Sequence, residues 1–328
     1  MRWLKSLVLA AVAMFVAAPT VRAETLDAKR VPGGVKWLLH IDADALRASG
    51  LWKILREDIE KNPEWAPGVA HIEELTGMKF PDQLHGITVF GSTFTESGAV
   101  ILINADVNQT KILNLLQLDP NYTSYKHNNH EVHGWQDKGK QLYGAFHGAG
   151  WIAVGQSRDR VEAALDTGDG KGEALKAGAP VANGNAPGLL AYLAGSSLAE
   201  LKELQAAKTP LINELDMAWL AVGEQEKDMV LRAALTTKTP QVAEQLRASA
   251  EGLKAIVTLA AMNENADQGA KFVAELLKFV TVKAQEKVVS ADMKMPIDNI
   301  RGLIEKAQAM KAAEGAKKAP KAPAAPQE

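Results

Sequence analysis

Residues 87–116 read ITVFGSTFTESGAVILINADVNQTKILNLL, and this stretch shows how the chain is built. Its apolar runs, His85–Phe90 and Ala99–Asn104, have the composition of β-strands and are joined by a polar turn. A helix is expected from Asn108 to Leu116, because an asparagine side chain can accept a hydrogen bond from a free N–H of the first helical turn. The predicted order is therefore strand, turn, strand and helix.

Residues 217–246, MAWLAVGEQEKDMVLRAALTTKTPQVAEQL, repeat this order with little residue identity. Two strands and a long helix are predicted again, at Met217–Val222, Met229–Leu235 and Thr239–Met262. We therefore expect an α+β fold with two units, each an antiparallel sheet packed against helices, which an internal duplication could relate. A single split domain is the alternative.

The predicted boundaries follow the composition. The two α+β units are 24–167 and 188–310, and residues 168–187 between them form a linker rich in Gly, Ala and Pro. Residues 311–328 contain mainly Ala, Pro and Lys and are expected to be a disordered tail. Four lysines of this tail could make weak contact with an anionic surface: Lys311, Lys317, Lys318 and Lys321.

The N-terminus has the pattern of a secretory signal peptide. Arg2 and Lys5 precede an apolar run over Leu7–Ala18, which is shorter than the about 20 residues of a membrane-spanning helix. Small residues near position 23 predict cleavage between Ala23 and Glu24. We expect an exported, soluble protein without a transmembrane segment, in the periplasm as first choice and the extracellular medium as second.

Charge and cysteine content exclude several classes of protein. The chain has 37 basic and 39 acidic residues, and the basic Arg2, Lys5 and Arg22 lie in the signal peptide, so the remainder is acidic. A general nucleic-acid-binding role is therefore excluded, because phosphates require a basic surface. With 0 Cys, the chain has no disulfide, no thiolate zinc site and no cysteine nucleophile.

Two histidine motifs are candidate metal sites. In residues 127–133, HNNHEVH, Asn128 and Asn129 suit a two-residue hairpin turn, which places His127 opposite His130 and turns His133 to the other face. We expect no carboxylate beside His127 and His130, so two ligands are too few for a metal. The pair Asp166 and Asp169 lacks the spacing of a calcium loop.

The second motif is His40, Asp42 and Asp44, which would share one face of a strand. We expect Asp44 instead to cap a helix over Ala45–Glu60, which removes it from that face. Neither motif is therefore expected to bind a metal, and His40, Asp42, His127 and His130 are kept only as candidates. No catalytic residue and no cofactor are expected.

The stretch HIDADALRASGLW, residues 40–52, and the repeated strand–helix–hairpin–helix layout resemble a loose group of exported bacterial proteins of unknown function. The resemblance implies an exported location and an α+β fold. It implies no activity, because the group has none assigned.

Three classes of function fit these observations. The first is a non-catalytic envelope protein that binds an unidentified envelope protein or ligand through its sheet faces or the cleft between two units. The alternatives are an exported hydrolase that uses dispersed acidic residues and a structural or assembly-assisting protein. A deep pocket with clustered histidines or carboxylates would favour the enzyme, whereas a broad exposed apolar patch would favour binding or assembly.

Overall fold

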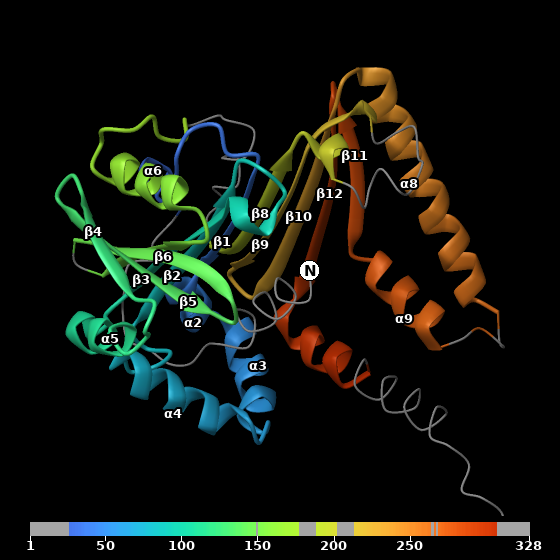
Figure 1. Cartoon of the computed structure of the whole chain (residues 1–328). Coiled ribbons are helices and arrows are strands. Elements are labelled where there is room, and N and C mark those ends of the chain that lie inside the picture. Colours follow the sequence, from blue (N-terminus) through green and yellow to red (C-terminus); the bar gives the residue numbers. More distant parts are fainter. Residues whose placement is uncertain are drawn as a thin grey trace, which may run out of the picture.

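The computed structural model describes residues 26–148, 150–176, 188–201, 213–263, 266 and 268–306 (Figure 1). The predicted cleavage site at Ala23 and Glu24 and the four lysines of the tail lie outside these residues. None of the described helices is both long and apolar enough to cross a membrane.

Within the described residues, the strands form one antiparallel sheet of 12 strands, in the order β11-β12-β10-β9-β8-β1-β2-β3-β7-β6-β5-β4. The strands of the first half are β1 (Trp37–Asp42), β2 (Leu84–Gly91), β3 (Ala99–Ala105), β4 (Thr123–His127), β5 (His130–Asp137), β6 (Lys140–His147) and β7 (Trp151–Gly155). Those of the second half are β8 (Leu189–Ser196), β9 (Leu215–Gln225), β10 (Asp228–Thr237), β11 (Val280–Gln285) and β12 (Val288–Pro296). The predicted α+β class is confirmed, with both halves joined in a single sheet.

Helices cover both faces of the sheet (Figure 1). They are α2 (Ala43–Ala48), α3 (Gly50–Glu60), α4 (Trp65–Thr76), α5 (Gln109–Leu116), α6 (Arg158–Gly168), α8 (Pro240–Ala261), α9 (Gln268–Leu277) and a last helix whose described part is 297–306. Short 3-10 turns are η1 (Ala28–Arg30), η2 (Glu96–Gly98) and η4 (Leu198–Glu200).

The predicted cap of the first long helix is wrong. Asp42, not Asp44, accepts the hydrogen bond from the N–H of Ala45, at 2.7 Å. The backbone of Asp42 is extended and becomes helical at the next residue, so Asp42 is at the capping position. The helix then breaks at Ser49, which caps α3 through a 3.0 Å hydrogen bond from the N–H of Trp52.

Alternation along the strands divides the core into two faces. Leu38 of β1 faces the same side as Ala153 of β7 and packs in one cluster with Val161 of α6. Ile41 points to the opposite side and packs with Trp52 of α3. A third cluster, around Met295, Ile297 and Ile300, joins α3 to the end of β12 through Leu51 and Ile54.

The two halves have similar strand orders. In each half three consecutive strands lie side by side, β1-β2-β3 and β8-β9-β10, and the third pairs with the last strand of its half, β7 or β12. The halves meet where β1 pairs with β8, with Leu38 opposite Ala194. Internal duplication stays a prediction, which this order favours.

The beginning of the predicted linker 168–187 is packed against the first half. Leu175 is buried in the core, its N–H bonds to the carbonyl of Val31, and Ala174 forms a β-bridge with Pro32. Residues 177–187 lie outside the described part of the chain. Residues 168–176 therefore belong to the structure of the first half, where they contribute to the site described next.

Candidate functional site

Three histidines lie in a row across one end of the sheet. The predicted hairpin is present, with His127 paired to His130 and Asn128 at a φ of 51° in its turn. The pairing of β5 with β6 then brings His130 next to His147, whose ring stacks on that of His130 at a centroid distance of 4.9 Å. Sequence reasoning missed His147, because its place in the row depends on a second hairpin.

The carboxylates come from the C-terminal end of α6. Oδ1 of Asp169 lies 3.0 Å from Nε2 of His130 and 3.0 Å from Nε2 of His147. Oδ1 of Asp166 lies 2.9 Å from Nε2 of His127. The expectation that no carboxylate stands beside these histidines is therefore wrong, because α6 crosses this face and ends above the row.

Two basic side chains complete this cluster. Nζ of Lys171 lies 2.9 Å from Oδ2 of Asp169. Arg30 donates a hydrogen bond to Nδ1 of His147 at 2.9 Å and stacks on the Trp151 ring, 4.5 Å from its centroid. The hydrogen bond from Lys171, followed by that from His130, holds the pKa of Asp169 well below its usual range. Asp169 is therefore a carboxylate at every physiological pH.

His133 lies on the opposite face of the sheet, as predicted. It is buried, with Nδ1 2.8 Å from the hydroxyl of Tyr122 and its ring edge-on to Phe146. Burial lowers the pKa of His133. Because it points away from Asp169, it belongs to the core and not to the histidine cluster.

The second predicted group does not assemble. His40 is buried and contacts Oγ1 of Thr88 at 2.9 Å through Nδ1, while Asp42 caps α2. Asp44 lies inside α2 and forms a buried ion pair with Arg47. These side chains support the entry into α2 and do not share one ligand set.

Asp44 is instead part of a buried polar cluster that the sequence did not indicate. Nδ1 of His85 lies 3.1 Å from Oδ2 of Asp44, and Arg47 donates to the carbonyls of Pro81 and Leu84. Burial lowers the pKa of Arg47, although nearby acidic groups oppose that shift. The cluster ties α2 to the chain entering β2 and therefore has a structural role.

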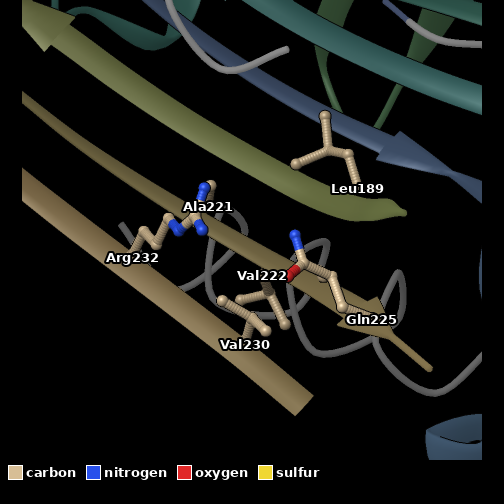
Figure 2. A pocket seen from close by; sticks show the side chains of 7 residues that line it. Leu189, Ala221, Val222, Gln225, Val230 and Arg232 are labelled. Carbon is tan, nitrogen blue, oxygen red and sulfur yellow. The ribbon is translucent and has the colours of Figure 1, made fainter. Parts of the chain in front are cut away.

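Two hollows among the described residues are small. One lies on the sheet between β8, β9 and β10, with about 240 Å³ of empty space open to solvent, and Arg232 and Gln225 reach toward it (Figure 2). A second of about 240 Å³ adjoins the histidine cluster at Arg30, His147 and Trp151. Ligand pockets usually measure about 300–1,000 Å³ and enclose most of the ligand. The enclosed space in each hollow is only about 10 Å³, far below that range, so neither of these two hollows supports the predicted ligand cleft.

A broad apolar surface is present on α8. Four large apolar side chains within ten residues are mostly exposed: Leu253 (62%), Ile256 (65%), Leu259 (67%) and Met262 (73%). We call these four residues the α8 patch. They recur every third residue, a spacing that turns each side chain by about 60° from the one before, so Leu253, Ile256 and Leu259 cover adjoining parts of the helix surface and Met262 follows at the helix end. This spacing was visible in the sequence, but it could not show which side of the helix packs on the sheet.

No family model matches the chain, and no curated protein matches it. Among solved structures, the chain is similar to crystal forms of a protein named TP0453. Form III has 9% sequence identity and a TM-score of 0.44, over 86% of this chain and 99% of that one. Form I has 10% identity and a TM-score of 0.41, over 86% and 98%, and form IV has 9% and 0.43, over 86% and 97%.

Proposed function

We propose that this protein is exported to the periplasm and there binds another envelope protein, without catalysis, through the α8 patch. The N-terminal charge and apolar pattern supports export, and the exposure of the α8 patch supports binding. The exposed patch is the single observation that carries the proposal.

The patch differs from ordinary surface hydrophobic residues. Single exposed apolar residues are common, whereas contiguous ones rimmed by polar residues mark interaction sites. The four side chains are mostly exposed, and α8 itself packs on α9, β11 and β12 at the end of the molecule opposite α6 (Figure 1). Burying one such side chain on binding stabilises a complex by about 1.5–3 kcal/mol before the costs of association.

The charges around the patch favour a protein partner over a lipid surface. Helices that lie on anionic membranes carry Lys and Arg beside their apolar face. From Gly252 of α8 to Asn263, just after the helix, the basic residue is Lys254, whose ammonium donates to the carbonyl of Val280 at 2.6 Å and so turns toward the sheet. A neutral apolar side suits the apolar side of a helix or strand in another protein.

Site-specific photocrosslinking in intact cells tests this proposal. A photoreactive residue at position 256 should give one discrete crosslinked product with another envelope protein, identified by mass spectrometry. The matched control is position 245, an exposed Gln on the same helix outside the patch, which should give none. The additional substitution Leu259→Lys should abolish the product at position 256 without altering the circular dichroism spectrum.

Three results would overturn the proposal. Equal crosslinking at 245 and 256 would indicate random collision, and a product made of two copies of this chain would assign the patch to self-association. Crosslinks to lipid alone would assign it to the membrane surface.

A further inference from the structure

We propose that His130, His147 and Asp169 form a binding site for a divalent transition metal of the zinc class. This site is separate from the α8 patch, so the inference does not depend on the proposed function. The sequence predicted the position of His130 in the hairpin. It did not predict that His147 and Asp169 lie beside it.

The donor atoms lie at distances that suit a metal. The two imidazole nitrogens and one carboxylate oxygen all lie within 4.8 Å of one another, and each Nε2 is 3.0 Å from Oδ1 of Asp169. Tetrahedral ligands at about 2.0–2.1 Å from zinc are about 3.3 Å apart. Each histidine–aspartate separation of 3.0 Å therefore has to open by a few tenths of an ångström, and the two imidazole nitrogens, which lie within 4.8 Å of each other, have to come to about 3.3 Å.

The backbone holds these ligands in place. His130 and His147 lie at the adjoining ends of the paired strands β5 and β6, two residues beyond the pair Val132 and Ala145, and their rings are stacked with an interplanar angle of 29°. Asp169 follows α6 directly, where its N–H bonds to the carbonyl of Leu165 at 2.9 Å. The next turn is closed by a hydrogen bond from the N–H of Lys171 to the carbonyl of Asp166 at 2.8 Å. A site prepared in this way loses little conformational entropy on binding.

The three side chains are partly exposed to solvent. The side chains of His130, His147 and Asp169 are 12%, 16% and 18% exposed, so they are largely covered but reachable from solvent. Three protein ligands with a position open to water is the arrangement of accessible zinc sites. Two imidazoles with one carboxylate favour zinc, nickel or copper over calcium and magnesium, which prefer oxygen ligands alone.

Arg30 and Lys171 define what must change when a metal binds. A neutral imidazole carries one proton, so a metal at Nε2 of His147 requires that proton at Nδ1, where Arg30 now donates. Arg30 can turn away, because Asp27 at 3.2 Å and the Trp151 ring remain its partners. Lys171 contacts Oδ2 of Asp169 and leaves Oδ1 to the metal.

Metal titration of the untagged protein, freed of metal by a chelator, tests the assignment. Zinc added in competition with a chromophoric chelator should bind with one equivalent at the site. Zinc affinity should fall in each of three variants, His130→Gln, His147→Gln and Asp169→Asn. The fall should exceed the about 10–100-fold loss that follows when only an outer-sphere partner of a ligand is removed. Zinc should raise the unfolding temperature of the unaltered protein and not that of these variants.

Two variants are matched controls. His71→Gln removes an exposed histidine of α4, and His127→Gln removes the histidine of the row that bonds to Asp166 instead of Asp169. Both should keep one equivalent and the unaltered affinity. Absence of zinc binding, or equal affinity in His130→Gln and His71→Gln, would overturn the proposal. Loss of binding in His127→Gln would overturn the assignment of Asp169 and move the site to Asp166.

Discussion

Glu224 caps a helix that begins 174 residues earlier in the chain: its Oε2 accepts a hydrogen bond from the N–H of Gly50 at 2.7 Å. The same oxygen lies 3.2 Å from the N–H of Leu51. Free N–H groups and the helix dipole give the start of α3 a partial positive charge, so a carboxylate there is favourable. Because Glu224 lies in the last two residues of β9 and Gly50 begins α3, this contact joins the two halves of the fold.

Glu224→Ala is therefore expected to lower the free energy of unfolding by about 1 kcal/mol, the usual effect of losing a capping side chain. Chemical denaturation at pH 7 measures this change. The matched control is Glu74→Ala on the exposed surface of α4, which should change stability by less than about 0.5 kcal/mol. Equal effects of the two substitutions would show that the contact with Gly50 does not hold α3.

The buried ion pair of Asp44 and Arg47 gives a larger expected effect. Removing Arg47 leaves the buried Asp44 carboxylate without its cationic partner and with His85 as its remaining contact, and breaking a buried ion pair in this way costs about 3–5 kcal/mol. Arg47→Met should lower the free energy of unfolding by that amount, since it also frees the carbonyls of Pro81 and Leu84. The exposed pair Arg56 and Glu60 is the control, and Glu60→Gln should cost less than about 0.5 kcal/mol in the same denaturation experiment. Similar costs for both pairs would contradict the role of Arg47.

Local patterns predicted most elements of this fold. The hairpin at Asn128 forms with the expected register, and Asn108 caps α5 by accepting from the N–H of Lys111 at 3.0 Å. Such features depend on neighbours in the sequence, where turn residues and caps act directly. The break between α2 and α3 at Ser49 was not predicted. The apolar pattern continues across Ser49, so the sequence did not show that this serine caps a second helix.

Only the part of the candidate site that depends on pairing within one hairpin was predicted. His127 and His130 were placed correctly because two residues separate them. His147 and Asp169 join them through a second hairpin and through the packing of α6 on the sheet, and tertiary contacts of this kind leave no fixed spacing in a single sequence. The glycine content of residues 168–172 also favoured a linker, whereas these glycines form the tight turn that carries Asp169.

The α8 patch should contribute little to stability if it is a binding surface. Ile256→Ser keeps a similar helix propensity and should change the free energy of unfolding by less than about 0.5 kcal/mol. Met295→Ala, in the core of the second half at 2% exposure, should cost about 2–5 kcal/mol. Thermal and chemical unfolding of both variants measure these changes. A large loss in Ile256→Ser would mean that the patch is covered by the chain itself.

His133 should make the fold less stable in mild acid. Burial lowers its pKa below the ordinary value of 6.5, so the unfolded chain binds more protons than the folded one as the pH falls below about 6.5. Stability is then lost toward lower pH by up to about 1.4 kcal/mol per pH unit, and none is lost above the unfolded pKa, where both states are neutral. His133→Asn removes the group that binds this proton. The free energy of unfolding of this variant should therefore fall less between pH 6.5 and 5.5 than that of the unaltered protein. Denaturation curves at both pH values measure the difference, with His71→Asn, which removes an exposed histidine of α4, as the control substitution. Identical pH slopes for His133→Asn and the unaltered protein would show that His133 takes up its proton without disturbing the core.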